Sequence, residues 1–149
     1  MSRLQFQRRV PYERAGVFDI VADVERYPEF IPGCRSARIV ERDGDRLLVE
    51  QEMGVGAWSW RFRTRATLSR PGRIEITTRE APFSHLDQVW RFEDLATGGT
   101  RVLLDVDYRL RNPLLRGLVS SLFAEGFRRT VAAFERRLHQ RLEPRGERR

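Results

Sequence analysis

The residues whose types could do chemistry are few and lie far apart in this sequence. Its two histidines are His85 and His139, and its one cysteine is Cys34. A structural or catalytic metal is usually held by several nitrogen or sulfur ligands at short, regular spacings. These three side chains have no such spacing, so we expect no metal site. A single cysteine also cannot form an internal disulfide, which agrees with a reducing compartment.

The run Ser84-His85-Asp87 contains the residue types of a hydrolytic triad. Neighbouring side chains of a strand point to opposite faces, so Ser84 and His85 would face apart. His85 and Asp87 would lie together on the wet outer face, as would Asp105 and Asp107 on the next strand. Cys34 is better explained as a small buried or half-buried thiol than as a nucleophile. We therefore expect no catalytic residues and no enzymatic activity.

The spacing of apolar residues predicts the elements that must position any site. Residues 4–10 alternate as in a strand, and apolar residues recur at helical spacing over 13–23. The prolines that follow, Pro28 and Pro32, leave room only for a single turn and a loop. From 34 to 110 the period becomes two, which is typical of an antiparallel sheet with one buried and one wet face.

A long helix should follow the sheet. Asn112 is a plausible N-cap, and Pro113 suits the first helical position. Apolar residues then recur on one side of the predicted helix as far as Pro144. About 29 residues at a rise of ~1.5 Å give a helix of roughly 43 Å. In so small a domain, such a helix is buried only if it lies along a concave sheet. The fold class is therefore α+β.

The inner face of the predicted sheet is rich in aromatic residues, and two packings remain open for it. The middle of the helix carries small residues, Gly126, Thr130 and Ala133, on or beside its apolar stripe. Glycine inside a helix costs ~1 kcal/mol relative to alanine, so something must favour it. Either the backbone approaches bulky tryptophans closely and the core is full, or the small residues leave a hollow lined by aromatic rings.

A length of 149 residues favours one domain, which we place at 1–143, with a basic, disordered tail at 144–149. No apolar run approaches the roughly 18 residues of a membrane span, and the N-terminus does not resemble a signal peptide. We expect a cytoplasmic protein.

The net charge is +7, and residues 128–149 hold eight arginines against three glutamates. A basic patch of this kind can attract lipid headgroups or phosphate backbones, although a solvated helix face explains it equally well. The arginines that would face a membrane or RNA are Arg128, Arg129, Arg136, Arg137 and Arg141.

Two sets of residues carry a resemblance to a known family. The opening set is Pro11, Phe18, Val21, Asp23-Val24-Glu25, Tyr27-Pro28, Phe30, Pro32 and Cys34. The later set is Pro82-Phe83, Leu86, Trp90, Phe92, Tyr108, Leu114-Leu115 and Phe134. Over residues 3–140 the chain resembles the coenzyme Q-binding START-domain proteins, which include the RatA-type ribosome association toxins. The family often has Trp where Gly33 stands and Gly where Ala81 stands, and both positions lie in loops expected at the mouth of the cavity.

The resemblance implies the helix-grip fold shared with polyketide cyclases: a curved antiparallel sheet of about seven strands, short helices after the first strand, and a hydrophobic tunnel. It also implies a polyprenyl quinone such as ubiquinone as bound ligand, with no other cofactor required, delivered unaltered in support of respiratory electron transport. The residues expected to line the cavity are Trp58, Trp60, Phe62, Trp90, Tyr108, Leu122, Phe123, Phe127 and Thr130. Tyr27, Phe30 and Phe83 are expected to bind ligand near its mouth.

Two alternatives to quinone delivery follow from the same resemblance. One is a RatA-type toxin that binds the large ribosomal subunit and blocks subunit association, with arginines on rRNA phosphates. The other is a cyclase or hydrolase of the same fold, which lacks candidate acid–base residues inside the cavity. We expect no DNA partner. The quinone hypothesis adds a peripheral location on the inner face of the plasma membrane, with the basic C-terminal end against anionic lipid.

Overall fold

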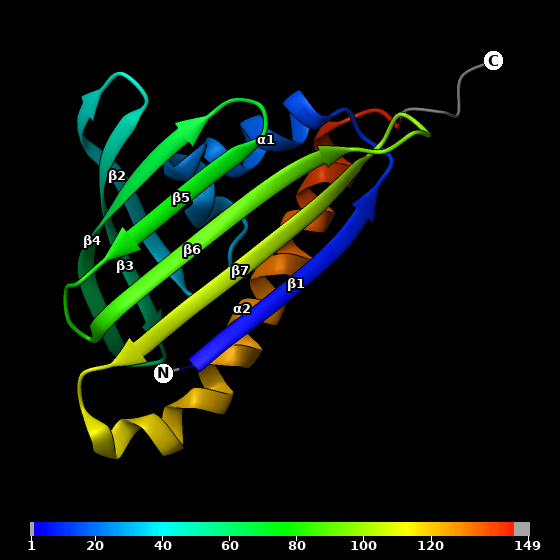
Figure 1. Ribbon diagram of the computed structural model, residues 1–149. Helices are drawn as coiled ribbons and strands as arrows, with labels where there is room; N and C mark the ends of the chain where they lie inside the picture. Colours follow the sequence, from blue (N-terminus) through cyan, green and yellow to red (C-terminus); the bar gives the residue numbers. More distant parts are fainter. Residues whose placement is uncertain (1, 145–149) are drawn as a thin grey trace.

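A computed structural model describes residues 2–144 of the chain, and the side chains of all of these except residues 2, 115 and 117–120. In chain order the elements are β1 (Ser2–Val10), α1 (Arg14–Ala22), the 3-10 helix η1 (Val24–Glu29), β2 (Cys34–Asp43), β3 (Arg46–Val55), β4 (Trp58–Ser69), β5 (Arg73–Thr78), β6 (Phe83–Asp94), β7 (Thr100–Leu110) and α2 (Pro113–Arg141). The expected α+β, helix-grip architecture is confirmed (Figure 1).

All strands of the described range join one antiparallel sheet of order β1-β7-β6-β5-β4-β3-β2. The strands from β2 to β7 follow one another as hairpins, and β1 adds to β7, so β1 and β2 are the two edges. Alternation decides which side chains point inward: on β4, Phe62 and Ala66 are buried while Arg61 and Arg63 are exposed. Strand β3 continues through Val55, and the turn to β4 lies at Gly56 and Ala57.

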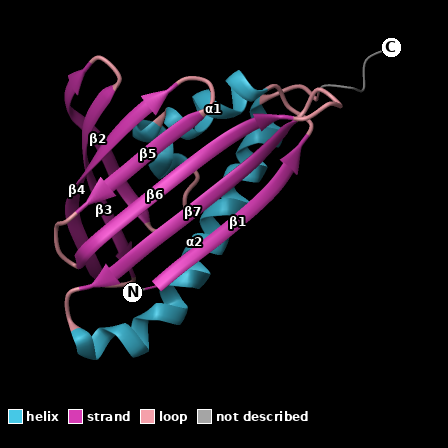
Figure 2. Cartoon of the chain, in the orientation of Figure 1, coloured by secondary structure: helices cyan, strands magenta, loops and turns pink. Residues whose placement is uncertain are grey.

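Helix α2 runs along the concave face of the sheet (Figure 2). Its start is the predicted one, since the Asn112 side chain accepts a hydrogen bond from the Leu114 backbone N–H at 2.9 Å and Pro113 opens the helix. Its 29 residues also match the expected length. The backbone of α2 lies closest to α1, β1 and β7, and its first turns extend beyond the end of β7 (Figure 1). The helix therefore covers one side of the inner face more fully than the other.

Helices α1 and η1 close the end of the sheet where β1 stops. Val17, Phe18 and Val21 are the buried face of α1, and the Phe18 ring lies 5.7 Å from that of Phe92 on β6. The region predicted as one turn is the 3-10 helix η1, which tolerates Pro28 because its run is short.

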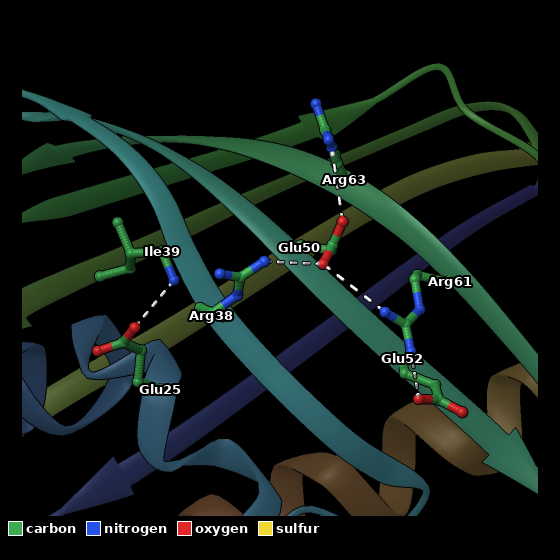
Figure 3. A network of polar contacts seen from close by, with 7 residues as sticks. All are labelled: Glu25, Arg38, Ile39, Glu50, Glu52, Arg61 and Arg63. Carbon is green, nitrogen blue, oxygen red and sulfur yellow. Dashed lines mark hydrogen bonds and ion pairs between the residues drawn. The ribbon is translucent and has the colours of Figure 1, made fainter.

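The outer face of β2, β3 and β4 carries a network of ion pairs (Figure 3). Glu50 lies 3.4 Å from Arg38 and 3.8 Å from both Arg61 and Arg63, as expected for surface arginines opposite glutamates. Exposed pairs of this kind each contribute only ~0–1 kcal/mol. Beside them, a Glu25 carboxylate oxygen accepts the Ile39 backbone N–H of edge strand β2 at 2.9 Å.

Most of the predicted tail 144–149 lies outside the described residues, which end at Pro144. Within the described range, no helix combines the length and the apolar character that crossing a bilayer requires.

Candidate ligand-binding site

One half of the space between sheet and helix is filled by aromatic rings centred on Phe134 of α2. We call this group, formed by Tyr27, Phe30, Trp90, Phe92 and Phe134, the Phe134 cluster. The Phe134 ring lies 5.2 Å from Trp90, 5.3 Å from Phe30 and 5.4 Å from Tyr27, each in an edge-to-face arrangement. Edge-to-face packing at these separations is ordinary close contact between rings, so this half of the interior is core.

A second group of rings lies toward the end of the sheet where α2 begins. This Phe123 cluster consists of Phe62, Phe83, Tyr108, Phe123 and Phe127. Phe123 lies 4.3 Å from Tyr108, 5.5 Å from Phe83 and 5.1 Å from Phe127. The three sheet residues are buried, whereas Phe123 and Phe127 are only partly buried. The helix side of this cluster is thus incompletely covered.

The uncovered side is the flank of α2 that carries Gly126 and Ala133. These positions are seven residues apart, so they share one side of the helix. Ala133 is 1% exposed, yet a Cβ added at Gly126 would meet nothing within 4 Å. The close-approach explanation for this glycine is therefore wrong, because Gly126 is exposed and no neighbour approaches it.

Strands β3 and β4 each contribute one further large apolar side chain near this end of the sheet. Met53 and Trp60 are direct partners in their register, and Met53 packs partly buried against the core while Trp60 is 40% exposed. Sequence reasoning missed Met53, although its alternation with the buried Leu47 and Val49 indicates an inward position. Met53, Phe123 and Phe127 are thus apolar side chains that the described residues cover only in part.

The structure brings together most of the residues expected to bind ligand, with four corrections. Trp58 is 75% exposed and Leu122 is 69% exposed, so neither lines an enclosed space. Tyr27 and Phe83, expected near the mouth of the cavity, are buried at 7% and 3% exposure. Half-buried Thr130 remains beside the open flank, where its hydroxyl donates to the Gly126 carbonyl at 2.9 Å.

Among the basic residues expected to face a membrane or RNA, Arg137 is also corrected. Its side chain is buried, donates to Glu29 at 2.6 Å and lies 4.7 Å above the Phe30 ring. The hydrogen bond from Arg137 lowers the pKa of Glu29 below its ordinary value. Glu29 lies 108 positions from Arg137 in the sequence, so no local sequence pattern could have predicted this pair. The remaining four, Arg128, Arg129, Arg136 and Arg141, are exposed.

The titratable groups near the rings are held in place by burial and hydrogen bonds. The Tyr27 hydroxyl donates to the Val21 carbonyl, and burial raises the pKa of Tyr27. Burial likewise raises the pKa of the Cys34 thiol to about 11, which supports its interpretation as an unreactive thiol. His85 bonds Asp107 at 2.9 Å, and Asp87 pairs with Arg79, both on the outer face as predicted.

A separate open cavity of about 370 Å³ lies outside the aromatic interior, between α1, η1 and the C-terminal part of α2. It is lined by Gly16, Asp19, Ile20, Asp23, Arg26, Phe30, Arg137, Arg141 and Leu142. Its mixed charges suit water rather than an apolar ligand. Within the described part of the chain, no three of its His, Cys, Asp and Glu side chains gather as metal ligands would.

The chain thus combines a curved antiparallel sheet that grips one long helix with an incompletely covered aromatic interior. The chain belongs to the family described as polyketide cyclase / dehydrase and lipid transport, whose model matches residues 10–135. The family's description thus includes both enzymes and transport proteins.

Three similar proteins illustrate this range. A protein of Pseudomonas aeruginosa named ribosome association toxin RatA is 32% identical over 139 residues, covering 93% of this chain and 96% of its own. The mitochondrial coenzyme Q-binding protein COQ10 of Dictyostelium discoideum is 24% identical, covering 89% of this chain and 67% of its own. A solved START superfamily protein of Mycobacterium smegmatis superposes with a TM-score of 0.81 at 20% identity, covering 93% of this chain and 97% of its own.

Proposed function

We propose that the protein binds a polyprenyl quinone, or a lipid of similar shape, between α2 and the sheet and delivers it unaltered to respiratory enzymes. The observation that carries this proposal is the partial exposure of the Phe123 and Phe127 rings, together with the open surroundings of Gly126 on the same half of α2. A polyprenyl tail gains ~25 cal/mol for each Å² of apolar surface that leaves water. Filling the flank with such a tail would complete the cover that the Phe123 cluster lacks.

Delivery without chemical change agrees with the state of the titratable groups near the rings. The Tyr27 hydroxyl is already bonded to a backbone carbonyl, and the buried Cys34 thiol stays protonated at neutral pH. General acid–base catalysis needs a group that exchanges its proton near the operating pH. We therefore assign these residues to packing rather than to catalysis.

The test is mass spectrometry of organic extracts from protein purified out of a quinone-producing host. We expect a quinone or another polyprenyl lipid in the wild type. Gly126→Leu should fill the open flank and remove the ligand, whereas the matched control Gly126→Ala should keep it because a single methyl group leaves the space open. Extracts that repeatedly contain no lipid, or equal lipid in both variants, would contradict the proposal.

The similarity to RatA favours ribosome association as a second candidate function. In that case exposed arginines of this chain would contact rRNA phosphates of the large subunit, and binding would weaken steeply as salt rises. Co-sedimentation with isolated large subunits at two salt concentrations, together with the ratio of free subunits to whole ribosomes after overexpression, tests it. An unchanged ratio would remove subunit blocking from consideration.

A further inference from the structure

The loops at one end of the sheet expose apolar side chains together. Because the strands are antiparallel, the segments 31–35, 54–61, 79–82 and 109–116 meet at the end where α2 begins, which we call the open end (Figure 1). Five large hydrophobic side chains among those described are exposed: Val55, Trp58, Trp60, Leu114 and Leu122. The first four belong to these segments, and Leu122 lies on the half of α2 that starts there. Such a concentration marks an interaction surface.

The hairpin tip that carries two of these residues is held in a defined position. Gly33 has a φ of +83°, and its carbonyl accepts the Gly54 N–H at 2.8 Å, which ties the loop before β2 to the end of β3. The Arg35 guanidinium donates to the Gly56 carbonyl across the same turn. Val55 and Trp58, which flank the turn, are 72% and 75% exposed. The tip therefore presents apolar groups to solvent from an ordered loop.

The open end is also strongly basic. Its four segments contain six arginines, at 35, 61, 79, 109, 111 and 116, and one acid, Glu80. Arg61 and Arg79 are ion-paired with acids on the adjoining strands. Arg35 and Arg111 instead donate to backbone carbonyls, Arg111 to that of Phe83 at 2.8 Å, and a carbonyl leaves their positive charge in place. At the opposite end, the segments 10–14, 43–46, 69–73 and 93–100 contain four arginines and five acids. Positive charge and exposed apolar groups thus coincide at only one of the two ends.

These two properties together select the chemistry of the partner. Arginines alone would suit RNA, and Trp58 could stack on a base. However, the aliphatic side chains of Val55, Leu114 and Leu122 gain little from phosphates or polar base edges, whereas they gain free energy on entering a lipid headgroup region. Tryptophan also prefers the membrane–water interface, and arginines beside it are attracted by anionic headgroups.

We propose that the open end docks on the surface of an anionic lipid bilayer, with Trp58 and Leu114 at headgroup depth and the arginines on lipid phosphates. The purpose of this docking rests on the proposed function, because it would place the partly covered Phe123 cluster next to the source of a membrane lipid. It also moves the membrane contact from the C-terminal arginines expected from the sequence to the other end of α2.

The experiment is co-sedimentation of the full chain with quinone-free vesicles of phosphatidylcholine, with and without phosphatidylglycerol. We expect binding only to the phosphatidylglycerol vesicles. Trp58→Ser should weaken it by about tenfold or more. Arg35→Gln and Arg109→Gln should each weaken it by about fivefold. The matched control, Arg46→Gln in the turn at the opposite end, should leave it unchanged.

A second measurement locates the contact. Lipids brominated near the headgroup should quench the tryptophan fluorescence, and Trp58→Phe should remove most of that quenching. Equal binding to both kinds of vesicle, no binding to either, or loss of binding by Arg46→Gln alone would overturn the proposal. If Trp58→Ser lost rRNA binding but bound vesicles as the wild type does, the membrane proposal would also be overturned, in favour of an RNA-binding surface. Because these vesicles contain no quinone, the two proposals can fail separately. The protein can carry a co-purified lipid without binding vesicles, or bind vesicles without carrying a lipid.

Discussion

At the end of the sheet where α1 and η1 lie, Phe134 touches Trp90, Phe30 and Tyr27, and the rings are buried beneath two helices. At the other end the same aromatic inner face meets only the first half of α2, and Phe123 and Phe127 stay partly exposed. Both halves are built from alternating strands and the same helix. The comparison teaches that the number of covering elements, rather than the residue types, decides which half is closed core and which half stays partly exposed.

The largest expected effect is on the free energy of unfolding, and it compares one mutation in each aromatic cluster. Phe134→Ala should lower the free energy of unfolding by about 3–5 kcal/mol, because it empties the centre of a closely packed cluster. Phe123→Ala should cost only about 1–2 kcal/mol, because much of its ring already contacts solvent. Urea denaturation with unchanged m-values measures both. Equal losses would mean that the open half is packed like the closed one.

A smaller effect concerns the open flank itself. Gly126→Ala should raise the free energy of unfolding by up to ~1 kcal/mol, because alanine favours the helix and its methyl group meets no neighbour. The matched substitution Gly16→Ala should not stabilise, since a Cβ at Gly16 would lie 3.2 Å from a Leu142 methyl carbon. A loss of stability in Gly126→Ala, followed by thermal denaturation, would show that the flank is occupied by protein.

The ion pair between Arg137 and Glu29, in the covered half, should make the stability of the protein depend on pH. Since the pKa of Glu29 is lowered by Arg137, its contribution is complete above the ordinary value of 4.5 and is lost as pH falls through the lower folded value. The melting temperature of Arg137→Gln should therefore fall less steeply below this pH than that of the wild type. Arg136→Gln, at an exposed neighbouring position, is the control and should follow the wild-type curve.

The smallest effect on stability, though a large one on rate, concerns Cys34 at the open end. Raising the pKa from 9.0 to about 11 lowers the thiolate fraction at neutral pH by about a hundredfold. Iodoacetamide should label Cys34 at least that much more slowly in the folded protein than in denaturing urea. Ser36→Cys in a Cys34→Ser background places a thiol at an exposed neighbouring position, where it should react at nearly the unfolded rate. Equal rates would show that the open end admits reagents freely.

Much of the fold could be predicted because its signals are local. The period of two placed Phe62 inward and Arg61 outward, and Asn112 with Pro113 marked the start of a helix whose length also proved right. Alternation assigns a face but does not say how far a covering helix reaches. For that reason Trp58 was placed in the interior although it lies beyond the cover.

The packing of the site depends on contacts between distant positions, which a single sequence does not reveal. The burial of Arg137 requires Glu29 and Phe30, both more than 100 residues away. Gly126 could equally have marked a tight approach or an open flank, because the same residue type serves both. Deciding between them needed the position of the sheet relative to α2.

One further consequence comes from the carboxylate of Glu25, which accepts the Ile39 N–H on edge strand β2. An edge strand with unpaired amides is a template on which a strand of another chain can assemble. Here one of those amides is already occupied, and the register of β2 is interrupted between Cys34 and Ser36 and again between Ile39 and Glu41. The β2 edge is therefore a poorer seed for sheet-to-sheet polymerisation than a regular edge whose outward amides are all unpaired.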